Sequence, residues 1–267
     1  MPVELNGSRV LLTGATGGLG QAIARALHER GAHLVLTGRR AEVLDGLVSE
    51  LGDRAEARAL DLSDAGAVRS FCEEVGTVEV LVANAGLPGT GKLGDYSPEQ
   101  IDRVFDVNFG SPVHMTHALL PGMLDRGRGH LVYISSMSGK VATPRSSLYN
   151  GTKFGLRGFA FAMREDLRGT GVGVTTVFPG FISDAGMWAD GGLDLPAGIR
   201  TKKPQQVAKA VIKGIEKDKA EIDVAPLPLR FGGWLAGPAP NAVAAINRRG
   251  GGDEMADALT ERQVEKR

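Results

Sequence analysis

Three side chains that lie close together in the sequence could carry out proton chemistry: Ser136, Tyr149 and Lys153. Tyr149 and Lys153 are four residues apart, so on a helix they would lie one turn apart on the same face. An ammonium group beside a phenol favours the phenolate and can lower its pKa by ~1–3 units. A helix N-terminus acts in the same direction. The spacing predicts a tyrosine with a pKa moved from ~10 toward neutral pH, where a general acid or base works best.

The residues before Ser136 predict where its hydroxyl lies. Residues 129–135 form an apolar, strand-like run, so Ser136 would follow the carboxyl end of a strand. Ligands of open α/β sheets bind at that edge. Tyrosine and lysine at this spacing also occur on many helices without a catalytic role. The assignment therefore depends on the elements around these side chains.

The composition of the 267-residue chain favours one large α/β domain, because no Ser/Gly-rich linker divides it. Lysine plus arginine and aspartate plus glutamate both number 31, so no charge excess indicates a nucleic-acid partner. The single cysteine, Cys72, excludes an internal disulfide and suits a reducing compartment. Residues 1–7 do not resemble a signal peptide, and no apolar run is long enough for a transmembrane segment. We therefore expect a cytoplasmic protein.

The histidines do not predict a metal site. The five histidines are scattered, and only His114 and His117 could share one face of a helix. No third ligand lies near them in the sequence, whereas zinc sites take at least three protein ligands. We therefore expect no bound metal.

Strand-like and helical patterns alternate along the chain, which is typical of an α/β domain. The expected strands cover residues 8–12, 33–37, 55–60, 78–83, 129–135 and 173–178. Helical patterns cover residues 21–30, 41–51 and 98–124, and a further helix carries Tyr149 and Lys153.

A glycine-rich turn, residues 13–20, joins the first expected strand to the first expected helix. Such a turn lets the backbone approach a pyrophosphate at the helix N-terminus. Gly14 would form the turn, Gly18 would allow the close approach, and Gly20 would let the helix pack on the strand. Because the turn lies between a strand and a helix, it indicates a dinucleotide-binding site more strongly than glycines alone would.

Two arginines after the second expected strand indicate which dinucleotide is bound. In a dinucleotide-binding fold this strand end reaches the adenosine ribose, where an acidic residue would select NAD. Here Gly38 is followed by Arg39 and Arg40. Cations at a helix N-terminus are unfavourable by ~0.3–1 kcal/mol each, and a bound phosphate would reverse that sign. Both could instead be solvated surface residues, but the sequence favours NADP over NAD.

Further polar residues follow the later strands. Asp61 could accept a hydrogen bond from an adenine amino group, or Asp61 or Ser63 could cap the next helix. The fourth strand is followed by Asn84-Ala85-Gly86. Asn108 lies near the middle of the expected helix 98–124, where asparagine is mildly unfavourable. We therefore expect Asn108 to contact backbone or water.

These motifs together make the chain similar to the short-chain dehydrogenase/reductase family, in its single-domain branch. Their order and spacing agree from about residue 5 to residue 182. The matching motifs are Thr13-Gly14-x-x-x-Gly18-x-Gly20, Asp61-Leu62, Asn84-Ala85-Gly86, Asn108, Ser136, Tyr149-x-x-x-Lys153 and Pro179-Gly180. The resemblance implies a doubly wound, mostly parallel α/β sheet of the Rossmann type, with helices on both faces. It also implies a nicotinamide cofactor across the strand ends.

The resemblance implies a role for each matching residue. Tyr149 would donate or accept the proton, and Ser136 would hydrogen-bond the substrate oxygen. Lys153 would lower the pKa of Tyr149 and hold the nicotinamide ribose, while Asn108 would hold, through a main-chain group, a water that links Lys153 to solvent. The implied cofactor-binding residues are Gly14, Thr16, Gly18, Leu19, Gly20, Arg39, Arg40, Asp61, Leu62, Asn84, Ala85, Gly86, Tyr149, Lys153, Pro179, Gly180 and Ile182.

The chain departs from the family pattern after Ile182 and at its C-terminal end. Ser183-Asp184 stands where a threonine is usual at the second position, so Ser183 or a backbone group would hold the carboxamide. The strand and glycine-rich segment that pack many members into tetramers are not expected here. We expect a catalytic domain over residues 1–228 and an extension over 229–267, which packs on the domain or a subunit interface and has a frayed end. By resemblance, we expect a homodimer through the helices at 98–124 and 149–168.

Residues 184–203 form the expected substrate lid, and their glycines give the segment freedom to move. Apolar residues in the lid favour a hydrophobic alcohol or carbonyl substrate; they are Met187, Trp188, Leu193, Leu195 and Ile199. The alternative is that the lid only packs on its own domain. In the extension, Phe231 and Trp234 would be a liability if exposed, so we expect burial against protein. Contact with a lipid surface is the alternative.

The sequence favours an NADP(H)-dependent oxidoreductase that interconverts a secondary alcohol and a carbonyl group, with Tyr149 as the acid/base. Two donors aimed at the substrate oxygen would stabilise its developing negative charge. Two alternatives stay open: an epimerase or dehydratase on the same scaffold, and a non-catalytic module that senses NADP(H). The combination of Ser136, Tyr149 and Lys153 argues against a sensor, which does not need an acidified phenol.

Overall fold

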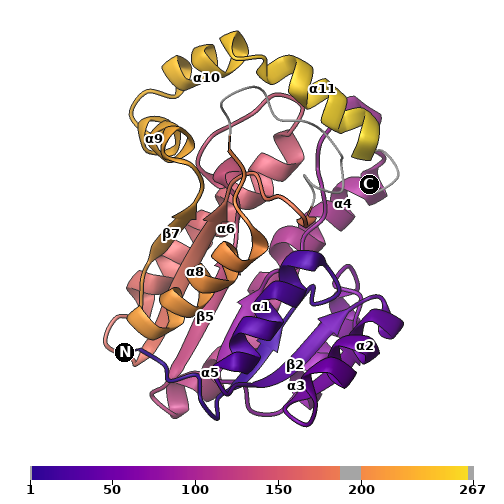
Figure 1. The fold of residues 1–267 in the computed structure, drawn as a ribbon, viewed down its shortest axis with the longest axis vertical. Helices are drawn as coiled ribbons and strands as arrows, with labels where there is room; N and C mark the ends of the chain where they lie inside the picture. Colours follow the sequence, from indigo (N-terminus) through magenta and orange to yellow (C-terminus); the bar gives the residue numbers. More distant parts are fainter. Residues whose placement is uncertain (1, 187–199, 264–267) are drawn as a thin grey trace.

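The computed structural model describes residues 2–186 and 200–263, and its centre is a sheet of seven parallel strands (Figure 1). The strands lie in the order β3-β2-β1-β4-β5-β6-β7. They are β1 Arg9–Leu12, β2 His33–Gly38, β3 Ala55–Ala59, β4 Val80–Ala83, β5 Gly129–Ile134, β6 Val172–Pro179 and β7 Glu221–Val224. The predicted doubly wound, parallel α/β sheet is therefore confirmed.

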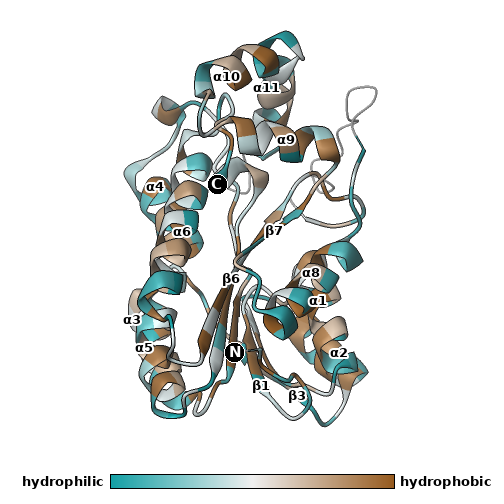
Figure 2. Cartoon of the chain, turned by 90° about the vertical axis from the view of Figure 1, so that its left-hand side faces the viewer, coloured by the Kyte–Doolittle hydropathy of each residue, from teal (hydrophilic) through white to brown (hydrophobic). Residues whose placement is uncertain are grey.

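Helices cover both faces of the sheet (Figure 2). One face packs on α1 Gly18–Glu29, α2 Ala41–Leu51 and α8 Pro204–Lys217. The other packs on α3 Ala65–Glu74, α4 Pro98–Phe105, α5 Ser111–Asp125 and α6 Ser147–Asp166. Because both faces are covered, the central strands β4, β5 and β6 bury every residue and are close to continuous apolar runs.

Helix α1 and strand β7 differ from the sequence prediction. Helix α1 begins at Gly18, three residues before the expected start at residue 21, so Gly18 and Gly20 belong to the helix. Strand β7 was not predicted, because it has only four residues and two of them are acidic. It pairs with β6 through the register Thr176↔Glu221 and forms one edge of the sheet. Charged side chains are common on edge strands, where they discourage pairing with another chain.

The helical stretch predicted at residues 98–124 is continuous but changes its geometry in the middle. Ser97 caps α4 by accepting a hydrogen bond from the backbone N–H of Gln100, and the Gln100 side chain accepts from the Ser97 N–H. A π-helical turn, Asp106–Gly110, then separates α4 from α5. π-Helical turns are rare in proteins as a whole, and those that occur often lie at functional sites. This one carries Asn108.

Three helices follow β7: α9 Leu227–Leu235, α10 Pro240–Arg249 and α11 Gly252–Gln263. Helices α10 and α11 run across the top of the molecule in Figure 1. Two contacts join α11 to loops of the domain. Thr90 Oγ1 donates to Gln263 Oε1 at 2.5 Å, and Arg145 Nε forms an ion pair with Asp257 Oδ1 at 2.7 Å. The segment expected to fray is thus helical as far as Gln263.

The described helices include none that is both long enough and apolar enough to cross a membrane. Phe231 and Trp234 are both exposed in the single chain, so the chain's own domain does not bury them. Helix α9 instead packs through its opposite side, where Gly233 is buried and Leu229 is partly buried.

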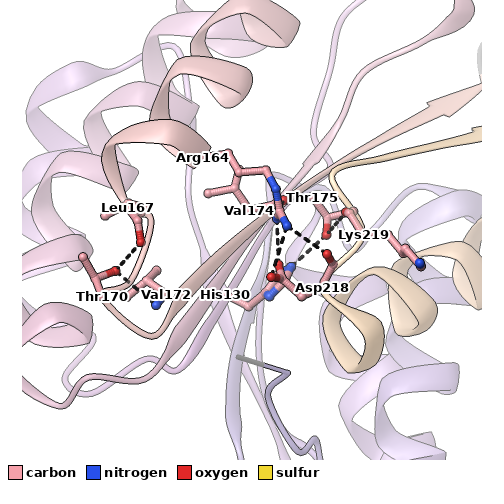
Figure 3. Close-up of polar contacts among 9 residues, drawn as sticks. All are labelled: His130, Arg164, Leu167, Thr170, Val172, Val174, Thr175, Asp218 and Lys219. Atoms are coloured by element: carbon pink, nitrogen blue, oxygen red, sulfur yellow. Dashed lines mark hydrogen bonds and ion pairs between the residues drawn. The ribbon is translucent and has the colours of Figure 1, made fainter.

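A polar cluster, buried at His130 and Thr175 and partly buried at Arg164 and Asp218, lies beside β5 and β6 (Figure 3). Arg164 donates to both carboxylate oxygens of Asp218, at 2.7 and 3.1 Å. His130 Nε2 lies 2.8 Å from Thr175 Oγ1, and the Thr175 hydroxyl donates to the Lys219 carbonyl. The Thr175 oxygen therefore accepts from an Nε2–H group. That leaves His130 Nδ1 unprotonated, buried and without a hydrogen-bond partner among the described residues.

Burial lowers the pKa of His130 to about 4, so acidification should destabilise the fold. The unfolded chain binds a proton near pH 6.5 and the folded chain only near 4, so stability is lost as pH falls through this window. The largest expected loss is ~3 kcal/mol. We expect His130→Gln to flatten the dependence of Tm on pH between neutral pH and pH ~5. Exposed His114→Gln is the control, and identical slopes in wild type and His130→Gln would contradict the prediction.

Candidate active site

The glycine-rich turn lies at the carboxyl end of β1 and leads directly into α1. Gly14 has a φ of 67°, and a Cβ at this position would lie 2.8 Å from Ala85 Cα. A Cβ on Gly20 would lie 2.2 Å from the Gly14 carbonyl oxygen, and one on Gly18 would lie 2.7 Å from Ala185 Cβ. All three positions therefore require glycine. Since the first turn of α1 carries no acidic residue, its positive end can receive an anion.

Thr13 joins this turn to the end of β4. Its hydroxyl oxygen accepts from the backbone N–H groups of Asn84 and Ala85, at 3.0 and 3.1 Å. The Asn84 side-chain amide donates to the carbonyls of Thr13 and Gly14, at 3.0 and 3.2 Å. Asn84 Oδ1 is buried and has no hydrogen-bond partner within the described part of the chain. Buried polar atoms are almost always paired, so this oxygen suits a donor from a bound molecule.

Arg40 extends across the glycine-rich turn. Its Nη2 donates to the Thr16 carbonyl at 2.5 Å, and Arg40 is also the residue that precedes α2. Arg39 beside it is exposed. Both arginines follow β2, and Arg40 also reaches the turn that leads into α1.

Asp61 lies after β3 and faces the same region. Asp61 Oδ1 accepts two hydrogen bonds from Ser63. The backbone N–H donates at 2.9 Å and the hydroxyl at 2.7 Å. These bonds, with a smaller contribution from Arg39, hold the pKa of Asp61 below its usual range. The side chain of Asp64 caps α3. The alternative that Asp61 or Ser63 caps this helix is therefore wrong.

The π-helical turn directs Asn108 toward the loop after β4. Asn108 Oδ1 accepts from the Leu87 N–H at 2.6 Å, and Nδ2 donates to the Leu87 carbonyl at 3.0 Å. Nδ2 also lies 3.3 Å from Thr152 Oγ1 on α6. Asn108 thereby fixes the segment that follows Asn84-Ala85-Gly86 against the helix that carries Tyr149. The predicted backbone contact of Asn108 is confirmed.

Ser136, Tyr149 and Lys153 come together at the carboxyl end of β5. Ser136 precedes a short 3₁₀ turn, Met137–Gly139, and its Oγ accepts from the Ser138 N–H at 3.1 Å. Tyr149 lies in the first turn of α6, within hydrogen-bonding reach of the Ser136 hydroxyl. Lys153 is buried one turn later, with Nζ 5.6 Å from the centroid of the Tyr149 ring.

Burial controls the pKa values of Tyr149 and Lys153. It raises the pKa of Tyr149 to about 12, against a smaller lowering by the hydrogen bond with Ser136. It lowers the pKa of Lys153 to about 8. The predicted lowering of the Tyr149 pKa is therefore wrong for the chain by itself, because desolvation disfavours both charged forms. At neutral pH this arrangement holds a phenol beside an ammonium group.

Several residues that position this group were not predicted from the sequence. Ser135 Oγ donates to the Lys153 carbonyl at 3.1 Å, and Lys153 Nζ donates to the Ile134 carbonyl at 3.0 Å. Asn150 donates to the carbonyls of Ser138 and Val141, at 2.6 and 3.0 Å. A polar residue beside Tyr149 on the buried side of an amphipathic helix could have identified Asn150, since buried amides need partners.

A second charged group supports the 3₁₀ turn from the side of β7. The Lys140 side chain is buried, and its Nζ lies 2.6 Å from Asp223 Oδ1 and 2.9 Å from Glu221 Oε2. Nζ also lies 4.0 Å from the centroid of the Phe178 ring. Arg157 forms two hydrogen bonds with the Glu221 carboxylate, at 2.7 and 3.2 Å. The loop that carries Ser136 is thus joined to the edge strand.

The segment after β6 closes the same side of the site. The Gly180 N–H donates to the Val224 carbonyl at 3.0 Å. Ile182 is buried and pairs in parallel with Lys202, and the Ser183 N–H donates to the Lys202 carbonyl at 2.9 Å. The two ends of the expected lid therefore lie side by side. Residues 187–199, which include all the apolar lid residues named above, lie outside the described residues.

Three predicted cofactor residues contribute to the apolar core. Leu62 and Ile182 are buried, and Leu19 packs against the core of the α1 face. Among the described residues, no cluster of three histidine, cysteine, aspartate or glutamate side chains is arranged to hold a metal ion.

The carboxyl edge of the sheet fits a dinucleotide cofactor in three respects. The helix end behind the glycine-rich turn is positive and unblocked, and Gly14 and Gly20 leave no room for a side chain. Arg40 lies across this turn, and Asn84 presents an unpaired buried oxygen beside it. Tyr149 and Lys153 lie farther along the same edge, after β5.

Comparison with known proteins agrees with this geometry. The sequence pattern of a family described as short chain dehydrogenase matches residues 8–193. The chain is 37% identical over 234 residues to the ketoacyl reductase HetN of Nostoc, covering 84% of this chain and 81% of HetN. A short-chain dehydrogenase structure from Streptomyces avermitilis has a TM-score of 0.76 and 27% identity, covering 91% of this chain and 95% of that one. A serine dehydrogenase structure complexed with NADP+ has a TM-score of 0.73 and 30% identity, covering 82% and 95%.

The requirement for glycine at position 20 can be measured by denaturation. Gly20→Ala would place a methyl group against the Gly14 carbonyl, so we expect it to lower the free energy of unfolding by ~1–3 kcal/mol. Gly46→Ala, on the exposed side of α2 with open space around it, is the matched control. It should instead stabilise the protein by up to ~1 kcal/mol. Urea unfolding of both variants checks the prediction, and equal effects would contradict it.

Proposed function

The chain belongs to the short-chain dehydrogenase/reductase family of oxidoreductases, which use a nicotinamide cofactor, and we propose that it interconverts a secondary alcohol and a carbonyl group with NADP(H). The observation that carries this proposal is the convergence of Ser136, Tyr149 and Lys153 at the carboxyl end of β5. A proton donor and a second hydroxyl within reach of one substrate oxygen suit the proton half of such a reaction.

The bound cofactor would supply or accept the hydride. In reduction, the Tyr149 hydroxyl donates its proton to the substrate oxygen, and the O–H bond of the tyrosine breaks as the O–H bond of the alcohol forms. Ser136 donates a hydrogen bond to the same oxygen and stabilises the charge that develops there. The Lys153 ammonium stabilises the phenolate that Tyr149 becomes.

The protonation states support reduction at neutral pH. With its pKa raised to about 12, Tyr149 holds the proton that reduction requires. Oxidation would require Tyr149 to begin as the phenolate, which burial disfavours in the chain alone. The name of the HetN relative, a ketoacyl reductase, agrees with this direction and places ketoacyl compounds first in a substrate screen. A hydrophobic carbonyl substrate would also suit the apolar residues of the expected lid.

Arg39 and Arg40 support NADP(H) over NAD(H). Arg40 is held at the glycine-rich turn by its bond to Thr16, and Arg39 is exposed beside it. Two guanidinium groups at this strand end offer charge-assisted hydrogen bonds to a ribose 2′-phosphate. The serine dehydrogenase relative complexed with NADP+ agrees with this choice.

We propose a homodimer that uses α4, α5 and α6. Phe105 on α4 and Phe154 and Phe161 on α6 are exposed in the single chain, at 41, 41 and 59%. Helices α4 and α6 contact each other, so these rings lie on neighbouring elements. Large apolar side chains on adjoining helices are typical of a subunit interface.

The single buried cysteine, Cys72, is compatible with a cytoplasmic location.

Tyr149→Phe tests the proton transfer. We expect turnover to fall by ~10²–10⁴-fold, because the phenolic proton is lost, while cofactor binding is largely kept. Lys153→Ala should reduce both turnover and cofactor binding. Turnover is measured as consumption of NADPH with a panel of aldehydes and ketones. Tyr133→Phe, which removes a buried hydroxyl outside the site, is the control and should keep turnover. Substantial activity in Tyr149→Phe would remove Tyr149 from this role.

Arg39→Ala with Arg40→Ala tests the cofactor choice. A charge-assisted hydrogen bond contributes ~1.5–3 kcal/mol, so we expect affinity for NADPH to fall roughly ten- to hundredfold and affinity for NADH to stay nearly constant. Arg168→Ala removes an exposed arginine just after the end of α6 and is the control. Fluorescence titration measures both affinities. Equal losses for the two cofactors would show that the arginines serve the fold.

A further inference from the structure

One face of α9 exposes three large apolar side chains. Leu227, Phe231 and Trp234 follow the spacing i, i+4, i+7, so they lie on the same side of the helix. They are 75, 62 and 71% exposed. The Phe231 and Trp234 rings lie against each other, with centroids 5.8 Å apart. We call this set the α9 face.

The opposite side of α9 is fixed to the domain. A Cβ on Gly233 would lie 2.7 Å from Met137 Cε, so the helix backbone rests directly on the turn after Ser136. Leu229 packs against the cluster of Met137, Phe178 and Ala225. The exposure of the α9 face therefore belongs to a packed helix, and it is not the result of a detached end. Figure 2 shows α9 at the surface near the upper end of the molecule, with strongly hydrophobic residues along it.

The charged residues of the α9–α10 segment have one sign. Residues 225–252 contain three arginines, Arg230, Arg248 and Arg249, and no aspartate or glutamate. All three arginines are exposed. Helix α10 packs against α9 and adds the exposed side chain of Ile246, at 61%. The α9–α10 unit thus combines exposed apolar and aromatic side chains with a purely basic set of charges.

We propose that the α9–α10 unit docks this enzyme on the surface of an anionic lipid bilayer. Basic residues beside an apolar helix face are the combination by which helices lie in a membrane interface. Each arginine near an anionic surface adds attraction, and tryptophan is favoured at the boundary between headgroups and hydrocarbon. Helix α9 has nine residues, so it can lie in the interface but cannot cross the bilayer.

The charge pattern favours a lipid surface over a second copy of the chain. A two-fold interface brings the same patch of both subunits together. This patch would then place arginines against arginines with no carboxylate from residues 225–252 to pair them. Like charges across an interface are unfavourable. The phenylalanines proposed for the dimer lie on α4 and α6, away from α9 in the sequence and on other elements.

Docking through α9 would bring the catalytic loop after β5 close to the bilayer. The helix rests on Met137, the residue after Ser136, so the docking surface adjoins the catalytic loop. A substrate dissolved in the lipid could then reach the site without crossing bulk water. The docking itself does not rest on the proposed reaction, and it can be measured without substrate or cofactor.

Flotation of the full-length protein with vesicles tests the proposal. We expect wild type to float with vesicles of phosphatidylcholine and phosphatidylserine, and much less with phosphatidylcholine alone. The double variant Phe231→Ser, Trp234→Ser should lose binding by ~tenfold or more, because two aromatic side chains no longer enter the interface. Arg230→Gln with Arg248→Gln and Arg249→Gln should remove the preference for phosphatidylserine. Leu93→Ser, an exposed leucine in the segment between β4 and α4, is the control and should bind like wild type.

Two further measurements keep the outcome decisive. In a Trp188→Phe background, Trp234 emission should shift to the blue and be quenched by brominated lipid, which reports docking without any change to α9. Sedimentation should give the double variant the same mass as wild type. Failure of wild type to float, unchanged flotation of the double variant, or an unshifted Trp234 emission would overturn the proposal. A smaller mass for the double variant would also overturn it, because the α9 face would then be an interface between copies.

Discussion

The carboxyl end of β5 and the first half of α6 are joined through one residue, Lys153, and the rest of the site depends on this junction. Its ammonium donates to the Ile134 carbonyl, and its own carbonyl accepts from the Ser135 hydroxyl. Strand and helix therefore keep a fixed distance, which places Tyr149 opposite Ser136. The contact leaves no room for a side chain at Gly139, where a Cβ would lie 2.7 Å from the Lys153 carbonyl oxygen. A buried cation held this way also needs several partners, because an isolated one would lose its proton.

Buried polar side chains join the remaining loops in the same manner. Thr13 and Asn84 connect the ends of β1 and β4, and Asn108 connects the next loop to α6. Each side chain satisfies backbone groups that a loop would otherwise leave unpaired. The edge of the sheet is thus held by hydrogen bonds at the places where the apolar core ends. Because side-chain hydrogen bonds hold these loops, the loops can be rich in glycine and still keep a defined shape.

The sequence was sufficient for most of the sheet, because buried parallel strands are continuous apolar runs and the first β–α turn is rich in glycine. It failed where a local pattern did not carry the deciding contact. Strand β7 is short and acidic, and its place is set by pairing with β6 and by the charges of Lys140 and Arg157. The pKa of Tyr149 was predicted from the nearest charge and the helix N-terminus, whereas burial of the side chain dominates it. The exposure of Trp234 likewise depends on which side of α9 meets the turn after Ser136, and only the three-dimensional packing shows this.

The contact between Thr90 and Gln263 has a consequence for how the protein is made. These residues are 173 positions apart, and Arg145 and Asp257 are 112 apart. A chain emerges from the ribosome from its N-terminus, so the glycine-rich turn and β1 to β4 are available before α11 is synthesised. Contacts between such distant parts of a chain also close slowly. The contacts of α11 with Thr90 and Arg145 therefore form after the surfaces that would hold the cofactor have already been synthesised.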